Sequence, residues 1–359
     1  MPARFKPVPD DCYITHGFGP DNGKTYYGVD FGKAGGSGNQ PVYAAQAGTV
    51  VYAGAARGFG GPAPAGWVVV DHPTEAGSGT TVYGSVVGEV TVGEWVHAGQ
   101  RIAHINPDPN TNGGYAPHLH FEVHPLEWRA GSQIDPVPWL GTAPAPTPEQ
   151  SNPPIHYGVD ISNHQPNINC HTIKAEGFRF AIIKATEGTW QDPYCAHHVT
   201  QARAAGLHTA AYAYVHSETS PQAHATALTA TINDPTVPTC LDIETNSGTD
   251  PAHWLAIKDT IEAHGHRVIL TYLPRWYWQQ VGTPNLVGLP PLWSSHYAEP
   301  QQGYAADIYQ RAGSAGWHSY GGVLTQLWQF SSQAAVAGHE IDVNAFRGTA
   351  TDLAQLFGN

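Results

Sequence analysis

Short apolar runs interrupted by glycine-containing turns occupy the first part of the chain. The runs are PVYAA (41–45), GTVVY (48–52), GWVVV (66–70) and TTVY (80–83). Runs of this length, rich in β-branched residues and separated by frequent turn signals, are typical of strands, and no convincing amphipathic helix lies between them. The pattern predicts an all-β domain over residues 1–140, folded as a β-sandwich or barrel.

The pattern changes after a Pro-rich segment at 141–155, GTAPAPTPEQSNPPI, which is typical of an extended linker. Apolar runs at 157–161, 180–184, 209–214 and 268–272 then alternate with helix-like stretches at 193–205, 221–233 and 251–264. The last two stretches begin with proline, which is favoured in the first turn of a helix. Strands alternating with helices indicate a parallel sheet, and seven or eight such units predict an α/β domain, a closed (β/α)-barrel, over residues 156–359.

Charge and composition restrict the partners. The 359 residues include 16 Lys and Arg against 29 Asp and Glu, a formal net charge of -13, which argues against binding to nucleic acid phosphates. No stretch approaches the ~18 apolar residues of a membrane-spanning helix, so we expect no membrane insertion. The first ten residues, MPARFKPVPD, contain no apolar segment of the kind found in secretory signals.

The four cysteines, Cys12, Cys170, Cys195 and Cys240, are too far apart for a zinc or redox motif. Cys170 and Cys195 each follow a predicted strand at the start of a helix. The pattern is compatible with one bridge between these two residues and with free buried thiols throughout.

Acidic residues gather where the predicted barrel strands end. Asp160 ends the first strand, Asp242 and Glu244 close a central strand, and Asp342 follows the last one. Residues two apart on a strand point to the same face, about 6.5 Å apart, so Asp242 and Glu244 project together. Because the first and last strands of a barrel are neighbours, Asp160 and Asp342 are expected at the same mouth, where the chemistry of such barrels takes place.

Four acids in one cleft suit glycoside hydrolysis. Mutual repulsion raises the pKa of at least one carboxyl, which can then act as a general acid near neutral pH. Cleavage of a glycosidic bond needs a protonated acid at the leaving oxygen and a second carboxylate facing the positive charge that develops on the sugar. Solvated strand ends and a divalent-metal site are the alternatives that the acids alone leave open.

Seven stretches of the second half match one known family in order. They are GVDIS (158–162), FAIIKATEGT (180–189) with Asp192, AY (211–212), LDIE (241–244), LWSSHY (292–297), LWQF (327–330) and IDVNAF (341–346). Residues 157–347 thereby resemble the lysozymes of glycoside hydrolase family 25, muramidases that cut bacterial peptidoglycan. The resemblance implies a somewhat flattened β/α barrel and no cofactor.

The same resemblance implies roles for the acids. Glu244 corresponds to the general acid/base, and Asp242 to the residue that orients the 2-acetamido group of the substrate, whose oxygen attacks the anomeric carbon. Asp160 and Asp342 correspond to the remaining acids at the floor of the cleft. The sequence Tyr-Ala-Tyr at 212–214 departs from the Tyr-His-Phe that the family often has there, which affects the lining of the sugar subsites and not the acids.

Aromatic residues near the strand ends fit a sugar-binding groove, because flat rings stack on pyranose faces. Aromatic residues also dominate core packing, so some of these are expected in the core, and Tyr212 and Tyr297 are the two that we favour individually. Trp276 and Trp278 are expected to cover the outside of the barrel. The groove candidates are Tyr212, Tyr214, Tyr272, Trp293, Tyr297 and Trp328.

The first domain contains parts of a zinc site. The stretches HGFG (16–19), YYGVD (26–30), PVYAA (41–45), GTVV (48–51), VGEWVHAGQ (92–100) and PHLHFEV (117–123) resemble the lysostaphin-type (LytM-like) zinc endopeptidases. On a strand, His118 and His120 face the same way, as two residues that meet one metal and its water must. Two family positions are lost, because Tyr26 stands where the first His ligand belongs and Ser85 where a second catalytic His belongs.

What remains of the zinc site is incomplete. Asp30 and His120 correspond to ligands and His118 to a lone catalytic partner, whereas a catalytic zinc normally has three protein ligands. We expect a degenerate site without zinc; rescue of the site by His16 or His72, and a metal held by the tyrosine, are the alternatives. His72 also fits an ordinary strand-end residue. Surface imidazoles are expected at His97, His104 and His124.

These features predict a peptidoglycan hydrolase, a muramidase joined by the linker to a degenerate domain that binds the wall or is structural. The expected partner is bacterial peptidoglycan and the expected state a monomer. A wall-degrading enzyme without a signal sequence resembles a phage endolysin, made in the host cytoplasm and active on the cell wall after release; an exported bacterial autolysin is the alternative. A bifunctional enzyme with an active zinc endopeptidase and a non-catalytic wall-binding protein are the other functions left open.

Overall fold

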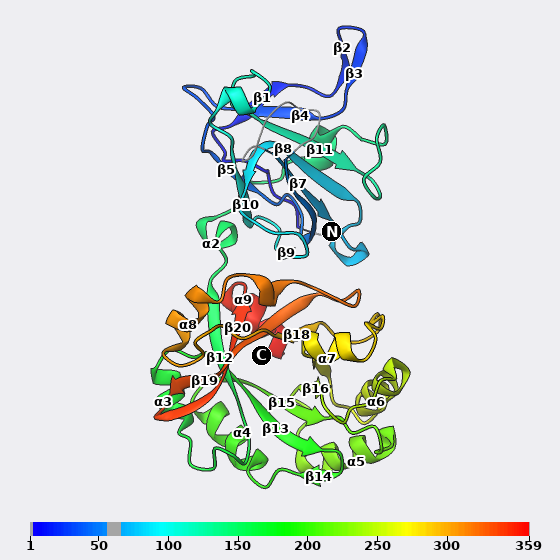
Figure 1. The fold of residues 1–359 in the computed structure, drawn as a ribbon, viewed down its shortest axis with the longest axis vertical. Helices are drawn as coiled ribbons and strands as arrows, with labels where there is room; N and C mark the ends of the chain where they lie inside the picture. The colour runs from blue at the N-terminus through cyan, green and yellow to red at the C-terminus, as the bar shows by residue number, and fades with distance from the viewer. Residues whose placement is uncertain (1–2, 56–65, 359) are drawn as a thin grey trace. The chain divides into compact units, whose positions relative to one another are not determined.

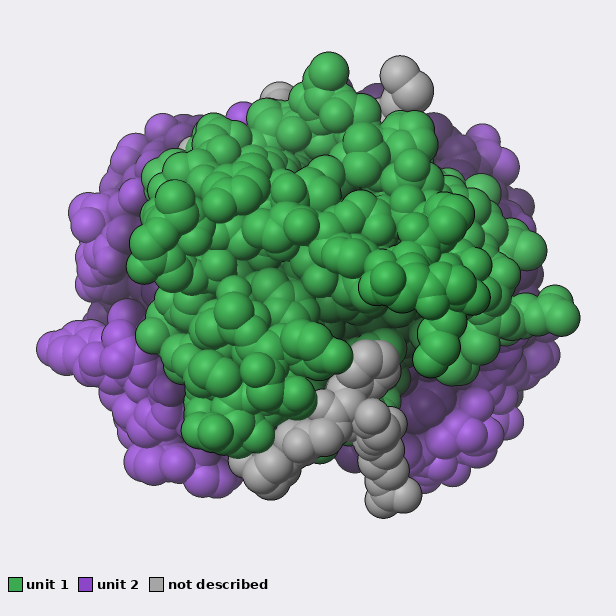
Figure 2. Space-filling model, turned by 90° about the horizontal axis from the view of Figure 1, so that it is seen from above, with its two compact units in different colours: residues 1–153 green, residues 154–359 purple. Residues whose placement is uncertain are grey.

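The structure is a computed structural model that describes residues 3–55 and 66–358. It divides into two compact units, Met1–Pro153 and Pro154–Asn359, which Figure 2 colours separately. No helix in the described part of the chain is long and apolar enough to cross a membrane.

Unit 1 is built mainly of strands. The expected strands at 41–45, 48–52, 66–70 and 80–83 correspond to β5, β6, β7 and the start of β8, and a short helix, α1 (Pro136–Leu140), follows the last strand. The strands are β1 (Tyr13–His16), β2 (Gly19–Asp21), β3 (Lys24–Tyr26), β4 (Val29–Gly32), β5 (Pro41–Tyr43), β6 (Gly48–Gly54), β7 (Gly66–Asp71), β8 (Thr80–Gly88), β9 (Trp95–Val96), β10 (Arg101–Ile105) and β11 (Leu119–His124).

The strands of unit 1 join in one nine-stranded antiparallel sheet, and β2 and β3 form a separate hairpin. The sheet order is β1-β4-β11-β8-β7-β6-β9, and β10 pairs with both β8 and β5. The long strand β8 joins its parts, because it pairs with β7 along one edge and with β11 and then β10 along the other. The expected two-sheet sandwich is therefore not confirmed among the described residues.

The segment expected as an extended linker contains a short helix, α2 (Pro148–Ser151). The Thr147 hydroxyl accepts a hydrogen bond from the amide of Gln150, and the Gln150 side chain accepts one from the amide of Thr147. This reciprocal capping satisfies two amides that a helix N-terminus leaves unpaired. The expectation of a wholly extended segment is wrong at these four residues.

Unit 2 contains a closed barrel (Figure 1). Its sheet has nine strands, of which β14 pairs with β13 alone; the other eight form a ring, because β12 pairs with β20 on one side and with β13 on the other. The strands are β12 (Ile155–Ile161), β13 (Phe180–Glu187), β14 (Trp190–Gln191), β15 (His208–Tyr214), β16 (Thr239–Asp242), β17 (Val268–Tyr272), β18 (Leu292–Ser295), β19 (Thr325–Val336) and β20 (His339–Arg347).

The last strand of the barrel runs against the others. β20 pairs antiparallel with both β19 and β12, whereas the remaining ring pairs are parallel. The cause is the connection, because only Ala337 and Gly338 separate β19 from β20 and a parallel pair needs a crossover of a dozen or more residues. The expected all-parallel sheet is therefore wrong at β20. Asp342 also lies within this strand, near its start, and not after it.

Helices lie outside the ring of strands (Figure 1). The helix-like stretches at 193–205, 221–233 and 251–264 are α4, α5 and α6. Ser220 and Asp250 cap α5 and α6, since the side chain of each accepts a hydrogen bond from an amide of the first turn. The helices are α3 (Cys170–Ala175), α4 (Cys195–Ala204), α5 (Pro221–Thr231), α6 (Pro251–Ala263), α7 (Arg275–Gln280), α8 (Ala305–Arg311) and α9 (Ala350–Phe357).

Two apolar layers hold unit 2 together. One cluster fills the space between strands and outer helices, and a second fills the barrel interior. Leu353 and Phe357 of α9 belong to the interior cluster, and the Phe357 ring lies 5.4 Å from that of Phe180 at the start of β13. Helix α9 therefore closes the barrel at the amino ends of its parallel strands and leaves their carboxyl ends for chemistry.

All four cysteines are buried and free. Cys170 and Cys195 begin α3 and α4, as expected, but no bridge joins them. Burial raises the pKa of Cys170 to about 11 and that of Cys195 to about 12, so both remain protonated thiols.

Candidate active site

The barrel interior changes from apolar to polar toward the carboxyl ends of the strands. Side chains two residues apart on a strand share a face, so each interior column can pass from a packing residue to a functional one. The pairs are Ala210 and Tyr212, Cys240 and Asp242, Leu270 and Tyr272, and Leu327 and Gln329. A cavity of about 210 Å³ lies at this end, lined by Asp160, Tyr212, Asp242, Glu244, Tyr272, Trp293, Tyr297, Gln329 and Asp342. The structure thus brings all four predicted acids together.

Asp160 and Asp342 are partners in register on β12 and β20. Asp160 Oδ2 accepts hydrogen bonds from Asn344 Nδ2 (2.7 Å) and Gln329 Nε2 (3.0 Å). Burial raises the pKa of Asp160 to about 6, against the effect of these two bonds. Burial, together with the neighbouring Asp160, raises the pKa of Asp342 to about 9. At neutral pH the pair therefore keeps a proton on Asp342 and a charge on Asp160.

Asp242 and Glu244 form the second acidic pair. Asp242 ends β16, and strand-like bonding continues one residue further, since the Ile243 amide donates to the Tyr272 carbonyl (2.8 Å). Asp242 is 6% exposed, and its Oδ1 has no hydrogen-bond partner within the described residues. Burial raises the pKa of both carboxyls, and the next strongest effects are those of Glu244 on Asp242 and of Asp160 on Glu244. Burial and the neighbouring acids therefore favour the protonated form of both carboxyls.

Hydrogen bonds fix the loop that follows β16. The Glu244 amide donates to Ser247 Oγ (3.0 Å), and the Ser247 hydroxyl donates to the Val215 carbonyl (2.7 Å). Trp254 Nε1 on α6 donates to the Ser247 carbonyl (2.8 Å). The Tyr214 hydroxyl donates to the carbonyl of the residue after Glu244. Tyr214, expected to contact the substrate, is thus absent from the cavity lining and supports the loop.

The aromatic residues of the cavity are tied to two amide side chains. The hydroxyls of Tyr272 (2.8 Å) and Tyr297 (2.7 Å) both donate to Gln329 Oε1. Trp293 Nε1 donates to Asn344 Oδ1 (2.7 Å). Since the amide nitrogens of Gln329 and Asn344 donate to Asp160, one network joins the rings to the floor of the cavity.

Sequence reasoning missed Gln329 and Asn344. Gln329 and Asn344 lie within the stretches LWQF and IDVNAF, and strand alternation would have placed Gln329 on the same face as the interior Leu327. The same alternation places Trp328 on the opposite face, where it is fully buried against the outer helices. The expectation that Trp328 lines the groove is therefore wrong.

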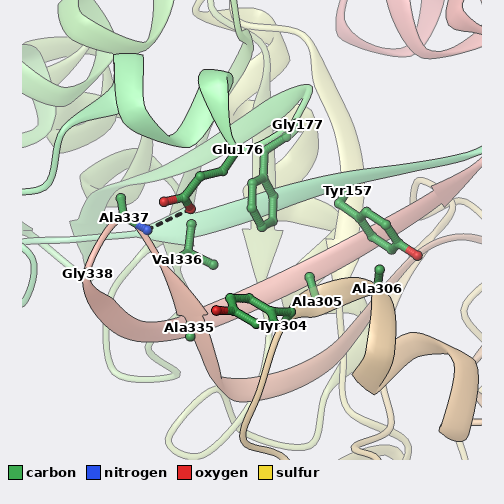
Figure 3. Close-up of a pocket in the computed structure, with 11 residues that line it drawn as sticks. Tyr157, Glu176, Gly177, Tyr304, Ala305, Ala306, Ala335, Val336, Ala337 and Gly338 are labelled. Atoms are coloured by element: carbon green, nitrogen blue, oxygen red, sulfur yellow. Dashed lines mark hydrogen bonds between the residues drawn. The ribbon is translucent and has the colours of Figure 1, made fainter.

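A larger cavity, of about 520 Å³, contains none of the predicted site residues (Figure 3). It lies between the β19–β20 turn, the end of α3 and the start of α8, and it is lined mainly by small and apolar side chains. Its one acid, Glu176, uses Oε2 to accept a hydrogen bond from the Ala337 amide (2.8 Å). This cavity lacks the convergent acids of the barrel mouth.

In unit 1 a tyrosine occupies the centre of the expected zinc site. The Tyr26 hydroxyl donates to Asp30 Oδ1 (2.6 Å) and lies 2.9 Å from His120 Nδ1. His120 Nδ1 is 3.0 Å from Asp30 Oδ1, and its Nε2 is 3.0 Å from Glu122 Oε1. His118 Nε2 lies 3.4 Å from the Ser85 hydroxyl. Both nitrogens of His120 are therefore taken by carboxylates.

These residues do not fit a zinc ion. Burial lowers the pKa of His120, but the bonds to Asp30 and Glu122 outweigh it and raise the pKa to about 9, so a proton competes with a metal for this imidazole. His72 is no substitute, because its nitrogens contact the Ala47 carbonyl and the Thr81 hydroxyl. Within the residues that the structure describes, no group of three or more His, Cys, Asp or Glu is arranged to hold a metal ion.

Two other histidines of unit 1, His16 and His124, contact residues of this network. The His16 ring packs edge-on against Tyr26, with centroids 4.3 Å apart, and its Nε2 is 3.7 Å from Asp21 Oδ2. His124, expected on the surface, is buried, and its Nε2 lies 3.0 Å from Glu122 Oε2. The expectation failed because His124 follows Glu122 by two residues on β11 and shares its face.

Models of two known protein families match the two units, one each. The model of glycosyl hydrolases family 25 matches residues 159–339, and that of peptidase family M23 matches residues 24–136. Lysozyme M1 of Streptomyces globisporus is 29% identical over 223 residues, 56% of this chain and 71% of that protein. The N,O-diacetylmuramidase of Arthroderma benhamiae is 28% identical over 203 residues, 48% of this chain and 86% of that protein. A solved structure, the bacterial lysozyme from Streptomyces coelicolor, is 26% identical with a TM-score of 0.48, covering 57% of this chain and 97% of its own.

Proposed function

Since the chain belongs to glycosyl hydrolases family 25, we propose that its barrel cleaves the β-1,4 bond between N-acetylmuramic acid and N-acetylglucosamine in bacterial peptidoglycan. The protein is a glycosidase, and the two relatives described above are a lysozyme and a muramidase. The observation that carries the assignment of the site is the cavity in which Asp160, Asp242, Glu244 and Asp342 converge.

Glu244 is the general acid in this proposal. Burial and neighbouring acids raise its pKa, which favours the protonated carboxyl that a general acid needs. Its proton passes to the glycosidic oxygen as the bond to the anomeric carbon breaks. The resulting carboxylate then takes a proton from the water that completes hydrolysis.

Asp242 holds the 2-acetamido group. Its buried Oδ1, which has no partner among the described residues, suits the N–H of an acetamido group. That bond stabilises charge on Asp242, and a charged Asp242 favours the proton on Glu244. The acetamido oxygen attacks the anomeric carbon, and water then opens the cyclic intermediate with overall retention. No covalent bond forms between sugar and protein.

Unit 1 acts without hydrolysis in this proposal, as a wall-binding or structural domain. The support is the network in which the Tyr26 phenol and the carboxylates on both sides of His120 leave no set of zinc ligands. An active endopeptidase is therefore not favoured.

Mass spectrometry of the products from one defined peptidoglycan, reduced with borohydride, tests the barrel's activity. We expect reduced muramic acid at the new chain ends. Reduced glucosamine would instead indicate the other glycosidic bond, and new amino termini without reducing ends would indicate a peptidase or amidase. An inverted product in NMR, or a sugar ester on Asp242, would reject the acetamido mechanism.

A further inference from the structure

We propose that Lys184 is a positioning residue of the active site, whose ammonium group sets the protonation of the catalytic acids while Glu187 limits its effect. The inference rests on the proposed function and adds a residue to it. Lys184 lies on β13 in register with Tyr212, a residue of the cavity lining. It follows the interior residue Ile182 by two positions, so its side chain starts from the interior face of the barrel.

The ammonium group of Lys184 is held in a defined place. Its side chain is 11% exposed, and Nζ lies 2.5 Å from Glu187 Oε2. Nζ is also 5.5 Å from the centre of the Tyr214 ring and 5.8 Å from that of Trp190, distances at which an aromatic face attracts a cation. A buried lysine with these partners is a fixed charge and not a mobile surface group.

The groups around Lys184 are mostly acidic. Its own strand contributes Glu187. Tyr214, whose ring lies 5.5 Å from Nζ, is the register partner of Asp242 on β16, and its hydroxyl donates to the carbonyl of the residue after Glu244. His216, after β15, lies with Nε2 3.5 Å from Glu187 Oε1. Tyr212 and Tyr214 on β15 and Asp160 on β12 are further titratable groups on the two strands that flank β13. Lys184 is a cation that acts on both members of the Asp242–Glu244 pair.

Lys184 and Glu187 act on the pair in opposite directions. Burial is the largest effect on the pKa of Asp242 and of Glu244 and raises both. Lys184 lowers both pKa values, and Glu187 raises both. Without the ammonium group, a charged Asp242 beside a protonated Glu244 would be reached only at higher pH. The Lys184–Glu187 ion pair thereby sets the pH range in which the enzyme is active.

Opposite substitutions test this arrangement. We expect Lys184→Met to move both limbs of the pH profile of kcat/KM to higher pH, by about one unit, the size of shift that a nearby opposite charge produces. Glu187→Gln should move both limbs to lower pH, and Lys184→Arg should restore the parent profile. Lys258→Met is the control, because Lys258 pairs with Asp259 and Glu262 on α6.

Carboxyl titration by ¹³C NMR in the full chain labelled at Asp and Glu gives a second readout that needs no activity. The raised carboxyl pKa values should rise further in Lys184→Met and fall in Glu187→Gln. Circular dichroism checks that each variant is folded. Limbs and titrations that stay in place in folded variants, or a rate loss equal at every pH that Lys184→Arg does not rescue, would overturn the proposal. If the parent releases no muramic acid ends, the proposed function fails while the titrations still decide the role of Lys184.

Discussion

Two backbone hydrogen bonds fix the position of Glu244. Its amide donates to Ser247, and the carbonyl of the next residue accepts from Tyr214. We expect Glu244→Gln to lower the initial rate of peptidoglycan cleavage by about 10²- to 10⁴-fold, the usual effect of removing a general acid. The amide has nearly the same shape, so circular dichroism should be unchanged. Glu176→Gln, at the acid of the larger cavity, is the matched control and should keep the parent rate. Cleavage within about threefold of the parent would contradict the role of Glu244.

The acids could be predicted from the sequence, and their partners could not. Asp242 and Glu244 share a face because they are two residues apart, which a sequence states directly. Asp160 accepts from Gln329 and Asn344, and these contacts exist only because β19, β20 and β12 pair in one register. Strand alternation gives the face of a side chain and not the residue beside it on the next strand.

Helix α9 closes one end of the barrel with two apolar side chains, Leu353 and Phe357. We expect Phe357→Ala to lower the free energy of unfolding of unit 2 by about 3–5 kcal/mol, since a buried Phe loses its transfer energy and leaves a cavity. Gln355→Ala on the exposed face of the same helix is the control. Urea denaturation, monitored by hydrogen exchange in β13 and β15, measures the free energy of unfolding of both variants. Equal stability of the two variants would show that α9 does not serve as a plug.

Among the secondary-structure elements, local sequence signals correctly predicted the helix starts, which depend on contacts within one turn. The helices α5 and α6 begin at the expected prolines behind Ser220 and Asp250, because caps act within one turn. The direction of β20 and the single sheet of unit 1 could not be predicted in this way. The turn at Ala337 and Gly338 determines the direction of β20. The pairing of β8 with three strands determines the single sheet of unit 1.

The whole of unit 2 should lose stability as the pH rises above neutral. Burial raises the pKa of Asp342 to about 9, far above the value of ~3.9 for an unfolded Asp. Between these two values the folded state binds more protons than the unfolded state, so the free energy of unfolding falls as pH increases.

Hydrogen exchange at pH 7, 8 and 9, corrected for intrinsic exchange rates, measures this dependence for unit 2 separately from unit 1. We expect a declining free energy of unfolding in the parent and a flatter dependence in Asp342→Asn, which cannot ionise. An equally steep decline in the variant would assign the effect to other groups.

The full chain should contain well under one zinc ion per molecule. The Tyr26 phenol, with an unperturbed pKa of about 10, is a poor ligand at neutral pH, and His120 is occupied on both nitrogens. In Glu244→Gln, which silences the barrel, we also expect no release of new amino termini from peptidoglycan. Elemental analysis and an amine assay measure the two quantities. Stoichiometric zinc with chelator-sensitive amine release would make the protein bifunctional.

The antiparallel closure of the barrel has a consequence for biosynthesis. Asn344 donates to Asp160 across 184 positions of sequence, and Asp342 is the register partner of the same residue. A nascent chain emerges from the ribosome amino end first. Asp160 is therefore translated long before Asp342 and Asn344, which lie near the end of unit 2. Contacts of such long range also slow folding. A chain that ends before β20 therefore lacks Asp342 and Asn344. The active site is complete only after β20 has been translated and has paired with β12.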